Sequence, residues 1–351
     1  MNVAVVGMGV SGLRTAMLLE RAGVEVQLFE ARDRVGGRVW TVEEDGLAYD
    51  AGGEWLDADH LRALALVKEL DIELMPTGAW PRDIFFQGKH CTEATLWNDA
   101  LEDDLRVEAA ARELCRDLHS VPWKNQHRLD LDQRNLAEFI LGTATSARGL
   151  WWRTAQIRSD EGDEPNRIGL LGWLTGYLHY LDRDDDVMSA YRLKGGMSNL
   201  CHAMAATLKA EIQFSHRLRR IDRTGGPVQL QFDDATATAD AVVLSLPPPA
   251  LERVAFNPAL SSTSRCAIEA CGMSRVLKIA MEFSEPWWDA MGSKGSIHCD
   301  GPLQQLWDAT QGERHVLTAY VCGDDTTEWL QNPAPLRKAV EELSAICPPA
   351  A

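Results

Sequence analysis

Apolar residues near the N-terminus predict a strand, a helix and a second strand in close succession. Residues 3–6 form a short apolar run rich in β-branched side chains, as in a buried parallel strand. Residues 13–21 are predicted to form a helix, and residues 24–29 a second strand. The sequence GMGVSG lies between the first strand and the helix. This order of strand, glycine turn, helix and strand indicates an α/β fold.

The glycine turn matches the pattern G-x-G-x-x-G through Gly7, Gly9 and Gly12, with Ser11 before the last glycine. In this pattern the first glycine forms a tight turn, the second lets a pyrophosphate approach the backbone, and the third lets the helix pack on the strand. The second strand ends in Glu30, at about the spacing of an acidic ribose ligand. A glycine turn alone is weak evidence, but this context predicts dinucleotide binding. The charge of Glu30 would repel a 2′-phosphate, which makes NADP the least suitable dinucleotide.

Beyond residue 58 the apolar spacing becomes helical. The stretches with this spacing are residues 61–70, 101–118, 136–141 and 170–181. Proline and charged residues separate them, so we predict a mainly helical lobe inserted into the first domain. Several tryptophans fall in this lobe, but tryptophan more often packs in a core than contacts a substrate, and none is assigned a role.

After residue 190 the chain is predicted to return to the first domain. A helix is expected at 202–209, and short strands at 211–214, 218–222, 228–232 and 240–247. A further strand with alternating polarity lies within residues 273–288, another strand at 316–324 and a helix at 336–346. We therefore predict a discontinuous nucleotide-binding domain, residues 1–57 and 190–255, and a substrate domain, residues 58–189 and 256–351.

The net charge of −17 over 351 residues argues against nucleic acid and anionic membrane surfaces as partners, because phosphate binding needs a basic face. Acidic clusters at residues 102–104 and 184–186 are interpreted as solvated surface. The length is sufficient for two domains with substantial cores.

Further features of the sequence favour a cytoplasmic protein. The first strand begins at residue 2, which leaves no room for a signal peptide, and no apolar run is long enough to span a bilayer. The eight cysteines show neither C-x-x-C nor a Cys/His metal spacing, so we expect reduced thiols and no metal site.

Residues 30–38, EARDRVGGR, resemble the E-x-R-x-x-x-G-G-R signature of the flavin-dependent amine oxidase family. The matching positions are Glu30, Arg32, Gly36, Gly37 and Arg38. Paired glycines allow close approach of a ligand, and the guanidinium group of an arginine offers a planar set of donors to phosphate. A solvated basic loop would account for the arginines but not for the paired glycines after a nucleotide-binding half. The predicted cofactor is therefore FAD.

The resemblance implies further cofactor contacts. A segment such as residues 47–56 runs along the flavin in this family, with Gly53, Glu54 and Trp55 as flavin neighbours and backbone N–H groups at the glycine pair near the ring. The same residues are also compatible with a hairpin that carries a glycine bulge. Leu218 matches the residue whose backbone meets adenine.

Lys278 interrupts an otherwise apolar, alternating stretch. A lysine within a strand usually protects a sheet edge or extends to solvent. The family has a lysine at this place that hydrogen-bonds a water beside flavin N5, and a partly buried ammonium suits proton transfer. The resemblance therefore implies that Lys278 is the catalytic lysine.

The implied fold class is α/β: a Rossmann-like FAD-binding domain, of the general type that binds NAD(P), with an inserted α+β substrate domain. The implied function is an FAD-dependent oxidase of an amine or amino acid C–N bond. Hydride passes to flavin N5, an imine forms, and O₂ is reduced to H₂O₂. The alternative within this fold is a flavoenzyme similar to the desaturases or to protoporphyrinogen oxidase, which act on large apolar substrates.

The family's A-G-E and G-A-x-x-S-G elements, which follow the helix predicted at 336–346, do not occur in this chain. A third expectation is therefore a catalytically weak flavoprotein subunit whose partner is a second chain or another copy of itself. The covalent cysteine linkage of some members belongs to the same part, so FAD is expected to bind non-covalently.

Overall fold

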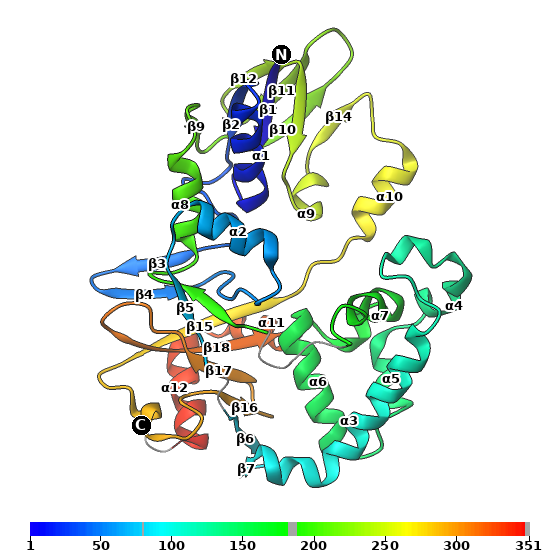
Figure 1. Ribbon diagram of the computed structural model, residues 1–351, viewed down its shortest axis with the longest axis vertical. Helices are drawn as coiled ribbons and strands as arrows, with labels where there is room; N and C mark the ends of the chain where they lie inside the picture. The colour runs from blue at the N-terminus through cyan, green and yellow to red at the C-terminus, as the bar shows by residue number, and fades with distance from the viewer. Residues whose placement is uncertain (79–80, 182–187, 348–351) are drawn as a thin grey trace. The chain divides into compact units, whose positions relative to one another are not determined.

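The computed structural model describes residues 1–78, 81–181 and 188–347, and the chain divides into two compact units (Figure 1). Unit 1 is Met1–Thr77 with Met188–Met273, and unit 2 is Gly78–Val187 with Ser274–Ala351. These boundaries differ from the predicted domains, because residues 58–77 and 256–273 belong to unit 1. Leu66 and Val67 pack in the main core of unit 1, and residues 255–257 form a strand of one of its sheets. The division into cofactor and substrate domains stays a prediction.

A parallel four-stranded sheet forms the centre of unit 1. Its strands, in spatial order, are β13 (Ala241–Leu244), β1 (Asn2–Val6), β2 (Glu25–Phe29) and β9 (Ile212–Gln213). Val3 and Val5 of β1 pack with α1 (Val10–Arg21), α2 (Leu61–Glu69) and α8 (Ser198–Ala206). Ala4 and Val6 pack on the opposite face. Because both faces of β1 are buried, its sequence is apolar throughout.

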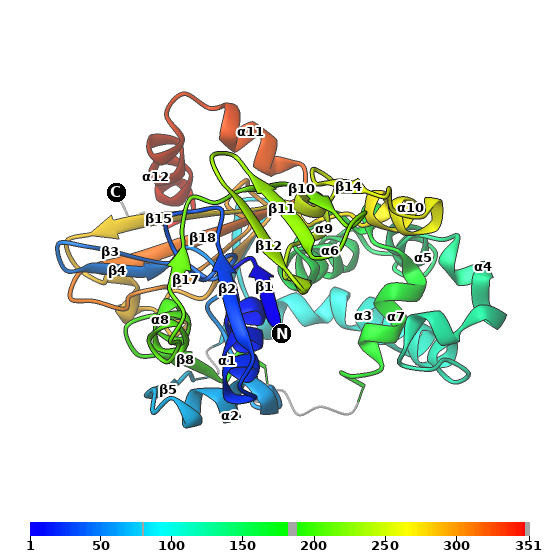
Figure 2. The ribbon, with the colours of Figure 1, turned by 90° about the horizontal axis from the view of Figure 1, so that it is seen from above.

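The opposite face of this sheet packs against a second sheet, as Figure 2 shows. Its strands, in spatial order, are β12 (Thr236–Ala239), β11 (Val228–Phe232), β10 (Leu218–Asp222) and β14 (Ala255–Asn257). The remaining elements of unit 1 are a hairpin of β3 (Thr41–Glu44) and β4 (Leu47–Asp50), a pair of β5 (Leu74–Pro76) and β8 (Tyr191–Leu193), and the helices α9 (Pro248–Leu251) and α10 (Ser262–Ala270).

A six-stranded mixed sheet organises unit 2. Its spatial order is β15 (Val276–Phe283), β18 (His315–Cys322), β17 (Gln305–Asp308), β16 (Ile297–Cys299), β6 (Asp83–Phe86) and β7 (Lys89–Thr92). One face packs with α11 (Asp325–Gln331) and α12 (Pro335–Ile346) around an apolar core. The other helices of unit 2 are α3 (Glu93–Cys115), α4 (Leu129–Asp132), α5 (Leu136–Leu141), α6 (Ala147–Glu161) and α7 (Leu170–Tyr177), with 3₁₀ turns that include η3 (Pro165–Arg167).

The strands predicted for unit 1 are present, with their ends shifted by a few residues. The prediction of the helical lobe was incomplete. Neither α6 nor the hairpin of β6 and β7 was predicted from the sequence. Apolar and polar residues are poorly separated around α6, so its periodicity is weak. Its ends are nevertheless clear, because the side chain of Ser146 accepts a hydrogen bond from Gly149 N and Gly162 ends the helix in a left-handed conformation.

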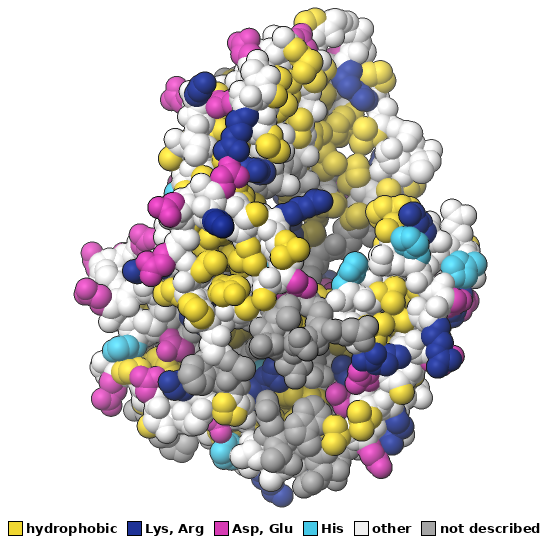
Figure 3. Space-filling view, viewed as in Figure 1, with side chains coloured by type: hydrophobic (Ala, Val, Ile, Leu, Met, Phe, Trp, Pro, Cys, Tyr) yellow, Lys and Arg dark blue, Asp and Glu magenta, His cyan; other side chains and the backbone are white. Residues whose placement is uncertain are grey.

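One face of the molecule carries side chains of both charges. Figure 3 shows Lys and Arg side chains interspersed with Asp and Glu on the face drawn, so the described residues there form no continuous basic surface for a phosphate backbone. None of the helices in the described part of the chain has the length and apolar character needed to cross a membrane.

The interpretation of residues 102–104 as solvated surface is wrong for Asp103, whose side chain is buried. Its carboxylate accepts hydrogen bonds from the backbone N–H groups of Thr145 and Ser146, both at 2.8 Å, and pairs with Arg106. The carboxylate therefore joins α3 to the start of α6. Residues 184–186, the other acidic cluster, lie outside the described residues.

We expect Asp103→Asn to lower the free energy of unfolding by about 2–3 kcal/mol near neutral pH, because an amide can accept from only one of the two backbone donors. Burial raises the pKa of Asp103, but hydrogen bonds from Ser146, Thr145 and Arg106 outweigh it and hold the pKa well below its usual range. Its stabilisation is therefore present above about pH 4 and is lost as the pH falls further. Urea unfolding from pH 3 to 7 would test this. The exposed neighbour variant Glu102→Gln should match the wild type, and equal unfolding curves for Asp103→Asn would contradict the prediction.

Candidate functional site

The glycine turn of unit 1 has the close contacts that the sequence pattern predicts. Gly7 adopts a φ of +96°, and a Cβ atom there would lie 2.7 Å from the carbonyl oxygen of Ser245. A Cβ atom on Gly12 would lie 1.8 Å from the carbonyl oxygen of Gly7. The turn therefore packs tightly against the residue that follows β13 and against the first turn of α1. A side chain at Gly7 or Gly12 would displace the backbone.

The N-terminus of α1 is suited to an anion. Gly9 is the N-cap residue, no side chain caps the helix, and the first turn, which includes Ser11, contains no acidic residue. The N–H groups of a helix N-terminus point outward, and the helix dipole favours negative charge there. This geometry fits the pyrophosphate of a dinucleotide.

Glu30 connects the end of β2 to the glycine turn. Its buried carboxylate accepts hydrogen bonds from Met8 N at 2.7 Å and from Arg32 N at 3.0 Å, one at each oxygen. A carboxylate can accept about four hydrogen bonds, so acceptor capacity remains for ribose hydroxyl groups. The residue is thus held in place before any nucleotide binds.

The paired glycines lie beside this turn, because Gly36 N donates to Met8 O at 2.8 Å. Gly36 has a φ of +103°, and a Cβ atom there would lie 2.5 Å from the carbonyl oxygen of Val39. The structure therefore brings Gly36 and Gly37 next to the G-x-G-x-x-G turn. The two parts of the sequence signature form one continuous backbone cradle.

The three arginines of this loop have different surroundings. Arg32 donates to the carbonyl oxygen of Gly37 at 2.9 Å, and Arg34 donates to the carbonyls of Val35, Gly37 and Val39. The guanidinium group of Arg38 is exposed and has no hydrogen-bond, ion-pair or ring partner within the described residues. Arg38 is therefore the arginine best placed to receive a phosphate.

Arg34 was not singled out by the sequence, since it lies at a variable position of the signature. Its guanidinium group lies 4.8 Å from the centre of the Trp40 ring, and burial, followed by the charge of Arg32, lowers the pKa of Arg34. Arg32, Asp33, Arg34 and Trp40 line an open hollow of about 650 Å³. A volume of this size suits a small-molecule ligand.

The glycine pair after the hairpin β3–β4 was expected to place its backbone N–H groups near the flavin ring. Gly52 N donates to Trp40 O and Gly53 N donates to Arg38 O, both at 3.0 Å, so these N–H groups already have backbone partners. The hairpin considered as the alternative is present, but it ends at Asp50, before the glycine pair. Beyond the glycines, Glu54 is buried and Trp55 is half-buried.

Leu218 begins β10, with its side chain in the apolar core that contains Phe29. Just before it, His216 N donates to Glu30 O at 2.8 Å and Ser215 N donates to Arg32 O at 3.0 Å. The chain that leads to Leu218 therefore runs beside the predicted ribose ligand. Its contact with adenine stays a prediction.

Lys278 lies in β15 of unit 2, opposite Tyr320 of β18. Its neighbours Ile279 and Met281 are in the apolar core, so alternation places Lys278 on the other face of the sheet. Its ammonium nitrogen lies 5.3 Å from the centre of the Trp307 ring, and the Trp307 and Tyr320 rings are 5.6 Å apart. Neither aromatic residue was predicted to lie near Lys278, because both are far from it along the chain.

The same face carries further polar side chains. Along one row of the sheet, Tyr320 is opposite Gln305, which is opposite His298. The Oε1 atom of Gln305 and the Nδ1 atom of His298 are buried and have no hydrogen-bond partner in the described part of the chain. Burial, aided by the charge of Arg82, lowers the pKa of His298 to about 3, so the ring is neutral. Burial, followed by the effect of Cys322, raises the pKa of Tyr320, so the phenol is also neutral.

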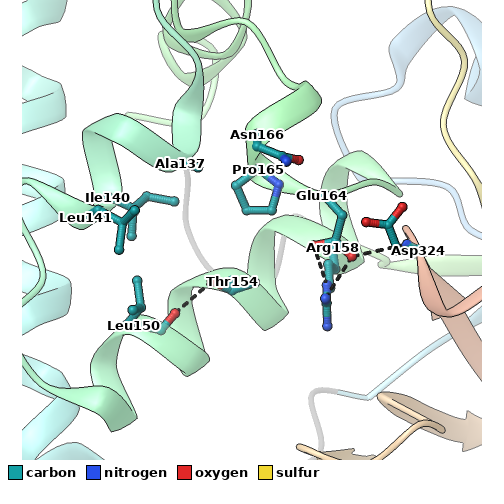
Figure 4. Close-up of a pocket in the computed structure, with 10 residues that line it drawn as sticks. All are labelled: Ala137, Ile140, Leu141, Leu150, Thr154, Arg158, Glu164, Pro165, Asn166 and Asp324. Atoms are coloured by element: carbon teal, nitrogen blue, oxygen red, sulfur yellow. Dashed lines mark hydrogen bonds and ion pairs between the residues drawn. The ribbon is translucent and has the colours of Figure 1, made fainter.

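A separate hollow of about 390 Å³ in unit 2 is drawn in Figure 4. Ile140, Leu141 and Leu150 form its apolar part. At the other end Arg158 donates to Glu164 through two hydrogen bonds, at 2.7 and 3.1 Å (Figure 4). The charged residues that line the hollow, Arg158, Glu164 and Asp324, all have ion-pair partners. We therefore assign the hollow no ligand.

Asp57, Asp59 and His60 of unit 1 hold their possible ligand atoms within 4.8 Å of one another. Asp59 and His60 are exposed, and the ring of His60 accepts a hydrogen bond from Asp57 N. Nothing further in the described residues indicates an ion there, and the expectation of no metal site stays a prediction.

Comparison with known proteins gives consistent similarities. A family profile described as "flavin containing amine oxidoreductase" matches residues 10–351. A Mycobacterium tuberculosis protein named "Putative flavin-containing monoamine oxidase AofH" is 30% identical over 330 residues, which cover 86% of this chain and 72% of that protein. Putrescine oxidase of Kocuria rosea is 28% identical over 384 residues, covering 98% of this chain and 78% of the relative.

Solved structures show the same fold. Cyclohexylamine oxidase from Brevibacterium oxydans IH-35A matches with a TM-score of 0.88 at 23% identity, covering all of this chain and 82% of that chain. A putrescine oxidase bound to putrescine matches with a TM-score of 0.87 at 22% identity, again over the whole of this chain and 83% of the other. The predicted α/β fold class is thereby confirmed.

Proposed function

Because the chain belongs to the flavin-containing amine oxidoreductase family, we propose that it is an FAD-dependent oxidase of a C–N bond in an amine or amino acid. FAD as cofactor and oxidoreductase as enzyme class follow from the family, as the sequence predicted. The observation that supports the proposal most directly is the backbone cradle of unit 1, which joins the glycine turn, Glu30 and Gly36 through short hydrogen bonds.

The residues of this cradle fit the parts of FAD. The N-terminus of α1 and the guanidinium group of Arg38 would hold the pyrophosphate, and Glu30 would hold the ribose. The backbone at Leu218 would meet the adenine, and Gly53, Glu54 and Trp55 would border the flavin ring. We expect all of these contacts to be non-covalent.

When bound, FAD would supply the two-electron oxidation of the C–N bond to an imine, with O₂ as the electron acceptor and H₂O₂ as its product, and water would hydrolyse the imine. In this proposal the ammonium group of Lys278 holds a water molecule and exchanges a proton at Nζ. The Trp307 ring, which itself packs on the Tyr320 ring, restricts the position of that ammonium group.

The names of the relatives suggest the substrates to test. Purified protein, reconstituted with FAD, would be mixed with putrescine, cyclohexylamine and a set of L-amino acids. We expect at least one of them to bleach the visible flavin absorbance without oxygen and to yield H₂O₂ in air. A reconstituted flavoprotein that none of these compounds reduces, but that a large apolar substrate reduces, would favour the desaturase-like alternative.

The cofactor assignment predicts that Glu30→Gln and Arg38→Ala each weaken FAD binding by about 1–3 kcal/mol, or about 5- to 150-fold in Kd. The first change removes a charged acceptor for ribose hydroxyls, and the second removes a phosphate donor. Titration of apoprotein with FAD measures the loss, and thermal unfolding of the apoprotein checks that both variants fold. Arg253→Ala, at another exposed arginine of unit 1, is the control. Wild-type affinity in both site variants would show that the nucleotide lies elsewhere.

A further inference from the structure

A second arginine, Arg192, is brought to the segment that follows the glycine pair. Leu56 N donates to Tyr191 O and Tyr191 N donates to Leu56 O, both at 2.9 Å, which pairs the two backbones antiparallel. One step along each strand, Trp55 and Arg192 therefore face each other as a non-hydrogen-bonded pair, where cross-strand side chains come closest. The carbon at the centre of the Arg192 guanidinium group lies 4.0 Å from the centre of the Trp55 ring.

The same guanidinium group forms an ion pair with Glu54. Its Nε atom lies 3.2 Å from Oε1 of Glu54, whose side chain is 1% exposed, while that of Arg192 is 13% exposed. A carboxylate removed from water to this extent needs a close positive partner, because the penalty for an unpaired buried charge is large. Arginine suits this place better than lysine, since a planar guanidinium group can stack on an indole and pair with a carboxylate together.

We propose that Arg192 is a positioning residue for the flavin-binding segment, fixing Trp55 and Glu54 in one arrangement. Because the guanidinium group of Arg192 lies over one face of the indole, that face of Trp55 is closed to the cofactor. The inference rests on the proposed function, in which Trp55 borders the flavin. Local sequence motifs gave no indication of this role, since Arg192 and Trp55 are far apart along the chain.

The test uses full-length protein with Arg192→Lys, Trp55→Leu and the double variant. The matched control is Arg219→Lys, at an exposed arginine of unit 1 that pairs with Asp233. Three quantities are measured: the visible circular dichroism of bound FAD, the Kd of FAD, and the Tm of the apoprotein. We expect Arg192→Lys to change the flavin dichroism and to raise Kd by about 3- to 10-fold, because lysine keeps the charge but cannot stack. The control should match the wild type.

The change in the Kd of FAD in the double variant shows whether Arg192 acts on FAD binding through Trp55. If Arg192 acts through Trp55, the double variant should show no larger change in Kd than Trp55→Leu alone. Wild-type dichroism and Kd in Arg192→Lys, with or without a lower apoprotein Tm, would overturn the inference and leave Arg192 a purely structural residue. Fully additive changes would also overturn it.

If Arg192→Lys does not fold, the Glu54→Gln variant is measured in its place. This change removes the carboxylate charge and with it the ion pair between Arg192 and Glu54. A change in flavin dichroism is then expected, and an unchanged signal overturns the inference. A wild-type chain that binds no FAD would refute the proposed function and this inference together, whereas normal wild-type binding with unaltered variants would refute only the inference.

Discussion

Replacing Lys278 with methionine is expected to lower amine-dependent H₂O₂ formation by about 100-fold or more, the scale of a lost proton-transfer group. Methionine keeps most of the apolar length of lysine, so the packing on Trp307 should persist while the ammonium group is lost. FAD occupancy should not change, because Lys278 lies in unit 2 and the cradle that we assign to the nucleotide is built from unit 1. Steady-state turnover, with the visible flavin spectrum recorded on the same sample, measures both effects.

Unit 2 provides a matched control for this change. The ammonium group of Lys338 lies 4.7 Å from the centre of the Trp329 ring, and the residue is on α12, which packs with the apolar face of the sheet. Lys338→Met therefore removes the same kind of cation–aromatic contact away from Lys278, and its turnover should stay within about 2-fold of the wild type. If Lys278→Met also kept wild-type turnover and oxygen reactivity, the lysine would be only a packing residue.

A methyl group at Gly12 should have the largest effect on the folded protein. The Cβ atom of Gly12→Ala would lie 1.8 Å from the carbonyl oxygen of Gly7 and 3.3 Å from the Cβ atom of Ser245. Both the turn and the start of α1 would have to move, which we expect to lower the free energy of unfolding by about 3 kcal/mol and to abolish measurable FAD binding. Denaturant unfolding of the apoprotein and FAD titration give the two values.

Gly225→Ala is the control for that substitution, because a Cβ atom at Gly225 would have no heavy atom within 4 Å. It should behave as wild type in both measurements. A Gly12→Ala protein with wild-type stability and FAD affinity would mean that α1 can shift away from β1 without cost, and the tight turn would not be required for the site.

The backbone cradle of unit 1 was predictable because the residues that form it follow one another closely in the sequence. The tight turn requires glycine at Gly7 and Gly12, and a helix and then Glu30 at the end of the next strand follow it. This short-range geometry is possible only with certain residue types. Alternation around Lys278 similarly predicted β15, since the period of a strand is local. Family membership, FAD and the fold class, all confirmed, rest on these local signals.

Contacts between segments far apart in the chain could not be predicted from such local patterns. Trp307 and Tyr320 join Lys278 only through the register of three strands, and Arg192 reaches Trp55 only because Tyr191 pairs with Leu56. Asp103 looked like one of three solvated acids, and its burial follows from the packing of α3 against the start of α6. Local spacing thus predicted the backbone cradle. The pairing of strands and helices far apart in the chain decided which side chains surround the charged residues, because burial and partner choice are properties of the packed chain and not of its local sequence.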